Sequence, residues 1–179
     1  NPFVGTDGYG NVYPGAQIPF GGIQISPDTD SRFYDAASGY KYNHLTLMGF
    51  SLTHLSGTGI PDLGDFLFIP GTGEMKLEPG THEDPDQGYR SRYSHDKEWA
   101  SPNYYAVELA DYGVKAEMTS GVRSGMFRFT YPESDNAFIM IDMNHTLWQS
   151  CEWSNLRMIN DSTITGYKLV KGWGPERHV

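Results

Sequence analysis

The sequence has almost no cysteine, few basic residues and no long apolar run, and each shortage excludes a class of protein. Its one cysteine, Cys151, cannot form an intrachain disulfide or a zinc site of several cysteines. Only 13 of 179 residues are Lys or Arg, against 22 Asp or Glu, so the formal net charge is -9. This acidity argues against binding to nucleic-acid phosphates. The longest apolar run, 137–141, is far shorter than the roughly 20 residues that span a bilayer, which excludes a transmembrane helix.

Amphipathic helices are lacking as well. No stretch keeps apolar residues at three- and four-residue spacing for three turns, because Gly or Pro interrupts most windows. The chain contains 21 Gly and 11 Pro, and 14% of its residues are aromatic. Many turn residues between short apolar segments are typical of an all-β fold. We therefore predict one antiparallel β-sandwich domain over residues 1–179.

Alternation of apolar and polar residues predicts the strands most clearly in the second half of the chain. Residues 104–109 and 114–119 flank a turn at 111–113, which predicts a β-hairpin. Residues 137–143 are almost all apolar, which predicts a central strand covered on both faces. Further strands are expected at 20–26, 45–52, 126–131 and 164–170.

Two familiar catalytic and nucleotide-binding motifs are broken at a required position. Gly8 and Gly10 begin a dinucleotide-binding pattern, but Tyr13 stands where its third glycine is needed. Around Ser51, Thr53 replaces the last glycine of a hydrolase nucleophile elbow. The sequence therefore supports neither a Rossmann nor an α/β-hydrolase function.

Two glycine-rich stretches, 5–16 and 49–65, combine hydroxyls, a histidine and carboxylates. Glycine allows close approach of the backbone to a ligand, and the polar side chains supply directional hydrogen bonds. Neutral polyols require this mixture together with aromatic rings, so the stretches indicate carbohydrate binding. A structural interpretation also stays open, in which His54 bonds a loop carbonyl and Asp62 and Asp65 cap turns.

The same stretches carry motifs that occur in a fixed order. They are NPFVGT at 1–6, PGA at 14–16, PFG at 19–21, SPDT at 26–29, SGYKY at 38–42, GFSLTHLSGTG at 49–59, AEMT at 116–119 and GW at 172–173. In this order they resemble the start of glycoside hydrolase family 92, the calcium-dependent α-mannosidases. The resemblance runs over essentially the whole chain, and its eleven-residue motif at 49–59 is the most specific part.

This resemblance implies a two-domain enzyme, in which an N-terminal β-sandwich packs on a C-terminal (α/α)₆ domain. It implies inverting hydrolysis of α-mannosides, α-1,2-linked ones among them, by a general acid and a general base. Calcium is implied as the cofactor, bound mainly by the helical domain, which also holds the acid and the base. We therefore assign no catalytic residue and no metal ligand to this chain, and we expect it to be an incomplete sandwich that is inactive alone.

The resemblance also implies a role for the loops at 5–15, 33–42 and 51–65, as one wall of the mannose pocket and part of the interdomain surface. We expect a first group of residues to bond sugar hydroxyls or the facing domain: His54, Ser56, Thr58 and Asp65. We expect a second group to shape the rim of the pocket: Tyr9, Phe33 and Tyr40.

A different class of function explains the composition equally well. A free-standing, non-catalytic carbohydrate-binding module would have the same fold, aromatic content and acidity. The resemblance favours the hydrolase and implies an exported protein, periplasmic or at the cell surface of a bacterium. A cut sandwich also exposes strand edges and apolar surface, so we expect the chain alone to self-associate.

Overall fold

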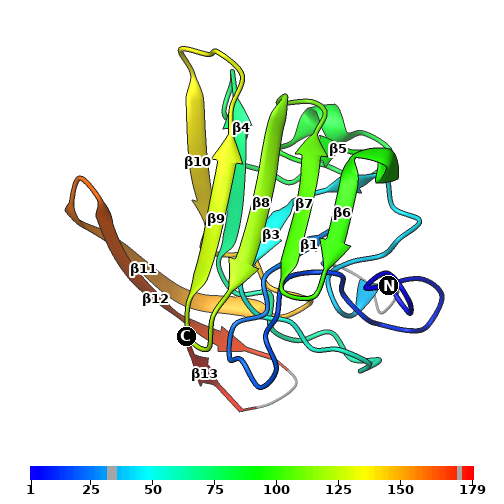
Figure 1. Cartoon of the computed structure of the whole chain (residues 1–179). Helices are drawn as coiled ribbons and strands as arrows, with labels where there is room; N and C mark the ends of the chain where they lie inside the picture. The colour runs from blue at the N-terminus through cyan, green and yellow to red at the C-terminus, as the bar shows by residue number, and fades with distance from the viewer. Residues whose placement is uncertain (32–35, 173–174) are drawn as a thin grey trace.

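Two four-stranded antiparallel sheets pack face to face in the computed structural model, which describes residues 1–31, 36–172 and 175–179 (Figure 1). The first sheet has the strand order β1-β3-β4-β10, with β1 at Ser26–Asp28, β3 at Gly49–Ser51, β4 at Leu67–Thr72 and β10 at Ala137–Asp142. The second has the order β6-β7-β8-β9, with β6 at Glu98–Ser101, β7 at Tyr104–Leu109, β8 at Val114–Ser120 and β9 at Gly125–Thr130. The prediction of an antiparallel all-β sandwich is confirmed.

Two smaller antiparallel sheets complete the described structure. Strands β2 (Thr46–Leu47) and β5 (Ser91–Arg92) pair beside the sandwich. Strands β11 (Ser150–Asn160) and β12 (Thr163–Lys171) form a long hairpin that extends away from the sandwich, and β13 (Arg177–His178) pairs with the end of β12 (Figure 1). Short 3₁₀ turns lie at Pro85–Gln87 and His95–Lys97.

The core lies between the two large sheets and follows from the alternation of side chains along β7 and β8. Alternate residues of β7 point inward and are buried, as are alternate residues of β8: Tyr105, Val107, Leu109, Val114, Ala116 and Met118. From the facing sheet Phe50 packs against Phe127 and Phe129, with ring centroids 6.5 and 6.3 Å apart. Burial of such side chains stabilises the fold by about 1.5–3 kcal/mol each.

The predicted hairpin at 104–119 is confirmed, since β7 and β8 pair along its length. The prediction for 137–143 is wrong in one respect. The strand forms, but β10 lies at the edge of its sheet within the described part of the chain, paired with β4 alone, and its side chains are at most half-buried. An apolar run indicates that a strand packs against other parts of the protein, but it does not distinguish a central strand from an edge strand.

The strand predicted at 20–26 is wrong over most of its length. The ring of Phe20 is fully exposed and its backbone φ is 60°, which no strand residue adopts. Ile25 is buried and forms an isolated bridge with Ala16, and the strand begins only at Ser26. The prediction at 45–52 is correct in place, although Met48 divides it into β2 and β3.

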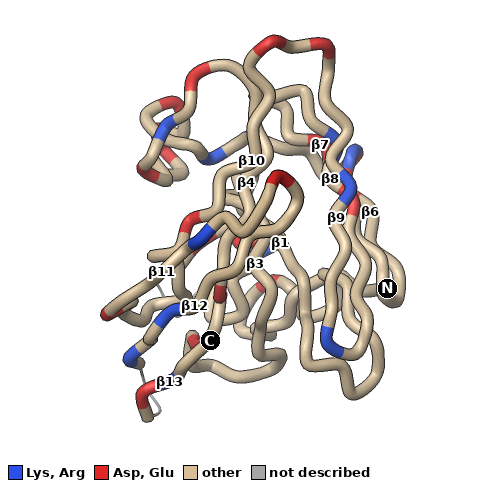
Figure 2. The backbone as a smooth tube through the Cα atoms, turned by 90° about the vertical axis from the view of Figure 1, so that its left-hand side faces the viewer, with Lys and Arg blue, Asp and Glu red and all other residues tan. Residues whose placement is uncertain are grey.

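Charged residues lie mainly on loops and at the ends of strands. In Figure 2 the acidic positions are spread over several segments and are not gathered at one place. Within the described residues, no helix is long and apolar enough to cross a membrane.

Candidate functional site

One buried carboxylate joins three loops at one end of the first sheet. Asp28 at the end of β1 is fully buried, and each of its oxygens accepts a hydrogen bond from a histidine. His54, in the loop after β3, lies 2.7 Å from Oδ1, and His145, in the loop after β10, lies 2.7 Å from Oδ2. Burial opposes ionisation of Asp28, but the charge and hydrogen bonds of the two histidines outweigh it and hold the pKa of the carboxyl well below its usual value.

The geometry around His54 assigns its protons. Its Nδ1 lies 2.6 Å from the carbonyl oxygen of Gln24, which only accepts. Its Nε2 lies 2.7 Å from the Asp28 carboxylate and 3.1 Å from Ser51 Oγ. Since both ring nitrogens face acceptors, both donate, and His54 is an imidazolium paired with a buried carboxylate.

A second buried carboxylate, Asp65, ties the loop after β3 to the β11–β12–β13 sheet. Thr53 Oγ1 donates to Asp65 Oδ2 at 2.9 Å, and Arg177 Nη1 donates to the same oxygen at 2.6 Å. Lys168 Nζ lies 3.4 Å from Asp65 Oδ1 and donates to the carbonyl oxygen of His145 at 2.5 Å. Burial lowers the pKa of the Lys168 ammonium, and Asp65 partly offsets this. The two carboxylate clusters therefore meet through His145.

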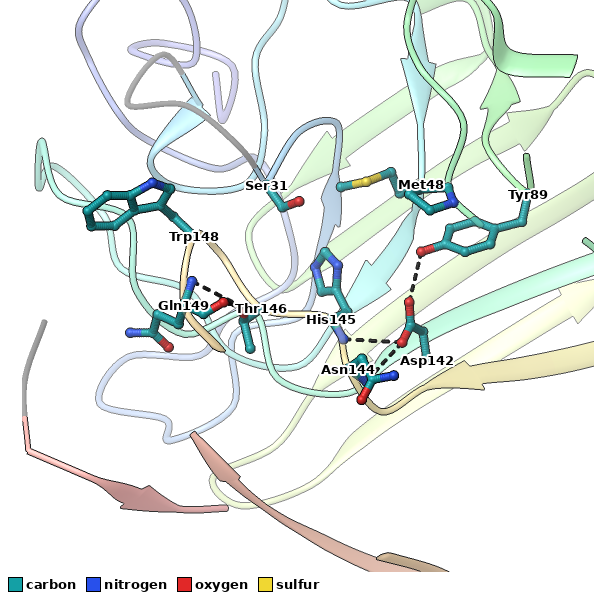
Figure 3. Close-up of a pocket in the computed structure, with 10 residues that line it drawn as sticks. Ser31, Met48, Tyr89, Asp142, Asn144, His145, Thr146, Trp148 and Gln149 are labelled. Atoms are coloured by element: carbon teal, nitrogen blue, oxygen red, sulfur yellow. Dashed lines mark hydrogen bonds between the residues drawn. The ribbon is translucent and has the colours of Figure 1, made fainter. Parts of the chain in front are cut away.

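A cavity of about 440 Å³ opens beside these clusters, next to the segment 142–149 (Figure 3). Asp142 shapes this segment, because its Oδ1 accepts from the backbone N–H groups of Asn144 and His145 and its Oδ2 accepts from Tyr89 Oη at 2.9 Å. Trp148 lies at the other end of the cavity, half-exposed and with a φ of 66°. Residues from several distant segments line the cavity, among them Ser31, Met48, Tyr89, Asp142, His145 and Trp148.

The cavity combines groups that suit a neutral, hydroxyl-rich ligand. Trp148 offers an aromatic face, and amide, hydroxyl and carboxylate groups supply hydrogen-bonding partners. The cavity wall also contacts the second glycine-rich loop, since Leu147 N–H donates to the carbonyl oxygen of Leu63 at 2.9 Å and the Gln149 side-chain amide donates to Asp62.

The three loops predicted to act together do lie together. The carbonyl oxygen of Asn11 accepts from the backbone N–H of Gly57 at 2.7 Å and from the hydroxyl of Ser38. Lys41 Nζ donates to the carbonyl oxygen of Gly8 at 2.8 Å. One backbone oxygen of the first loop thus holds both of the other loops.

The site residues predicted from the sequence differ in how exposed their side chains are. Tyr9 is 94% exposed, and Ser56 is also exposed. Thr58 is partly exposed and donates to the carbonyl oxygen of Ile60 at 3.2 Å. Phe33 lies outside the described residues.

Three of the predicted residues are buried. His54 and Asp65 belong to the two carboxylate clusters, which agrees with the structural alternative in which His54 bonds a loop carbonyl. Tyr40 lies in the core, where its hydroxyl donates to Glu98 Oε1 at 2.9 Å. Burial, together with the negative charge of Glu98, raises the pKa of Tyr40 far above its ordinary value. Within this chain Tyr40 supports the loops from inside and does not form a rim.

Asp142, His145 and Trp148 are not among the site residues that the sequence predicts. A signal for this segment was present, because the mostly polar segment DMNHTLWQ at 142–149 follows directly after the apolar run at 137–141. Such a polar group at the end of a strand is typical of a functional loop.

The carboxylates of this region do not form a calcium site. Calcium takes six to eight oxygen ligands, but both oxygens of Asp28 and of Asp142 accept internal hydrogen bonds, and Asp65 is paired with two cations. Across residues 1–31, 36–172 and 175–179, no group of three or more His, Cys, Asp or Glu is placed to hold a metal.

Comparison with known proteins identifies the family. The Glycosyl hydrolase family 92 N-terminal domain matches residues 1–179. The chain belongs to this family. Among solved structures, the GH92 family glycosyl hydrolase CcMan5 superimposes with a TM-score of 0.78 over 97% of this chain at 29% identity. A GH92 inverting mannosidase from Bacteroides thetaiotaomicron has the same fold, with a TM-score of 0.71 over 93% of this chain at 23% identity.

These relatives are much longer than this chain. The chain covers 24% of the CcMan5 chain and 21% of the Bacteroides mannosidase. A secreted glycosidase of Arthroderma benhamiae, itself uncharacterized, is 29% identical over 134 residues, which make up 74% of this chain and 17% of that protein. The chain therefore corresponds to the N-terminal domain of GH92 glycosidases.

Proposed function

We propose that this chain is the N-terminal domain of an exported, inverting α-mannosidase and supplies one wall of its substrate pocket. The observation that carries the proposal is the cavity beside segment 142–149, which is lined by Trp148 and by polar groups, in a chain of the GH92 family. A hexose has an apolar face that stacks on an aromatic ring and hydroxyls that need several hydrogen-bonding partners.

In this proposal the chemistry belongs to the C-terminal (α/α)₆ domain. That domain holds the general acid, the general base and the calcium ion, and this chain binds and orients the sugar. The Asp28 and Asp65 clusters act indirectly, because through His145 they fix the loop from which Trp148 reaches the substrate. The exposed Tyr9 stands on the first loop, which is held by the hydrogen bonds to the carbonyl oxygens of Asn11 and Gly8.

The test uses the family-length protein, by which we mean this chain within a protein as long as its GH92 relatives. Mannose release from an α-1,2-linked mannobiose is measured first with calcium and then with a chelator. We expect calcium-dependent release by the long protein and none by the 179-residue chain. Release that resists the chelator would contradict the calcium assignment. No release from any α-mannoside, together with tight sugar binding by the short chain, would favour a non-catalytic carbohydrate-binding module instead.

A further inference from the structure

The two histidines that share the Asp28 carboxylate differ at their second ring nitrogen. In His54 this nitrogen, Nδ1, lies 2.6 Å from the carbonyl oxygen of Gln24, so both nitrogens of the ring are used inside the protein. His145 donates from Nε2 to Asp28 Oδ2 at 2.7 Å, but its Nδ1 has no hydrogen-bonding partner in the described part of the chain. Only one histidine of the pair is fully used by the fold.

The unused nitrogen opens into the cavity beside segment 142–149. The side chain of His145 is only 4% exposed, yet it lines this cavity, where its ring faces Ser31 and Met48 (Figure 3). Among the described residues Nδ1 is not one of the fully enclosed atoms that lack a partner, so it is reached from the cavity. Because buried polar groups normally have a hydrogen-bonding partner, the partner of this atom has to come from the cavity.

The charges around Asp28 decide whether Nδ1 donates or accepts. Asp28 is ionised, since its pKa lies well below the usual value, and the His54 imidazolium is its counter-ion. A second imidazolium at His145 would bury a positive charge without a counter-ion, which is costly. His145 is therefore neutral, with its proton on Nε2 and a lone pair on Nδ1.

The His145 ring is also fixed before any ligand binds. The backbone N–H of His145 donates to Asp142 Oδ1 at 3.2 Å, and its carbonyl oxygen accepts from Lys168 Nζ at 2.5 Å. With Nε2 held by Asp28, little conformational freedom is left to lose on binding. The carboxylate behind the ring also makes Nδ1 a stronger acceptor.

We propose that His145 Nδ1 accepts a hydrogen bond from one hydroxyl of the sugar that binds in this cavity. The inference rests on the proposed function for the nature of the ligand. A group that meets this lone pair must carry a hydrogen, so a hydroxyl fits, whereas an ether oxygen or a methylated hydroxyl does not. His145 thus selects sugars in which one particular ring position carries an unsubstituted hydroxyl.

A metal ion is the other partner that a carboxylate-backed histidine commonly takes. It would need further ligands, and the described residues place no group of three or more His, Cys, Asp or Glu to supply them. The structure therefore favours the hydroxyl.

Two substitutions separate the sugar contact from the contact with Asp28. In the family-length protein, His145→Gln puts an amide N–H near the position of Nε2, so it still donates to Asp28 but has no lone pair at the position of Nδ1. His145→Asn is too short to reach Asp28. We expect His145→Gln to melt close to the wild type and His145→Asn to melt well below it.

Calorimetric titration with an S-linked α-1,2-mannobiose, which binds without being hydrolysed, measures the sugar contact. We expect His145→Gln to weaken this binding by about 3- to 10-fold, the effect of one neutral hydrogen bond. Analogues that each lack one hydroxyl identify the bonded position. One of them should bind the wild type more weakly by the same factor, and should bind His145→Gln as well as the parent sugar does, because the partner is already gone.

The possible failures are distinguishable. Unchanged sugar binding by His145→Gln, with mannose release intact, would overturn this inference and leave the proposed function standing. If the family-length protein neither binds the mannobiose nor releases mannose, other neutral sugars are titrated in the same way. A sugar that binds the wild type and binds His145→Gln about 3- to 10-fold more weakly would support this inference and count against the mannosidase alone. Absence of binding by every neutral sugar would overturn both.

Discussion

His145 Nε2 donates to Asp28 Oδ2 at 2.7 Å, although 117 positions separate the two residues in the sequence. The other oxygen of the same carboxylate holds His54. One buried side chain therefore fixes both the second glycine-rich loop and the loop that carries Trp148 in the wall of the cavity.

Replacing Asp28 by Asn tests this anchoring role. The amide nitrogen of Asn cannot accept from a histidine, and the imidazolium of His54 loses its counter-ion. We expect Asp28→Asn to lower the free energy of unfolding by about 3–5 kcal/mol, measured by urea denaturation at neutral pH. Asp7→Asn is the control, because Asp7 is exposed and its carboxylate accepts from the neighbouring Gly8 N–H, which an Asn side chain can still do; a change within about 0.5 kcal/mol is expected there.

The same variant should alter the pH dependence of stability. The folded state lowers the pKa of Asp28, so its contribution is fully present above the unfolded Asp pKa of about 3.9 and is lost as pH falls toward the folded pKa. We expect the difference in unfolding free energy between the wild type and Asp28→Asn to be largest at neutral pH and to shrink below about pH 4. A gap that stays constant from neutral to acidic pH would contradict this account.

Gly39 supports the Asp28 cluster from the backbone side. Its φ is +81°, and a Cβ at this position would lie 2.0 Å from Asp28 Oδ1. Gly57 is a matched control, with a φ of +76° and no atom within 4 Å of its Cβ position. We expect Gly57→Ala to cost about 1–2 kcal/mol for the left-handed backbone, and Gly39→Ala to cost about 1–3 kcal/mol more because of the clash. Equal melting temperatures for the two variants would show that the Asp28 cluster shifts to accommodate the added methyl group without loss of stability.

Trp148 provides the test of the cavity in the family-length enzyme. Removing an aromatic platform weakens sugar binding, so we expect Trp148→Ala to raise KM for an α-mannoside by about tenfold. Trp153→Ala is the matched control, since Trp153 is 49% exposed against 50% for Trp148 but lies on the hairpin beside Tyr167, away from the cavity. If both variants change KM to the same extent, the cavity is not the sugar site.

The sequence predicted the parts of the fold that depend on local alternation. In β7 and β8 the inward residues alternate regularly and a turn lies between them, so the hairpin could be placed correctly. The 11-residue length of β11 could not be predicted, because apolar and polar residues do not alternate regularly along this strand. Its pairing with β12 also contains two register shifts.

The candidate site could be predicted only in part, because its key contacts join distant segments. The motif at 49–59 drew attention to His54, but its partner Asp28 stands in a short strand and His145 stands beyond β10. Nothing local to His54 shows whether its ring faces a ligand or a buried carboxylate, and the same ambiguity applied to Asp65. The pairing emerges from tertiary packing.

The late position of His145 in the chain has a consequence for protein synthesis. A ribosome delivers the N-terminal segment first. Asp28 and His54 leave the ribosome long before β10 and His145. Until they follow, the first sheet lacks the strand β10, and the Asp28 carboxylate has only one of its two histidine partners. Translation must pass this point before the sandwich can complete its core, and arrested shorter chains are expected to require chaperones.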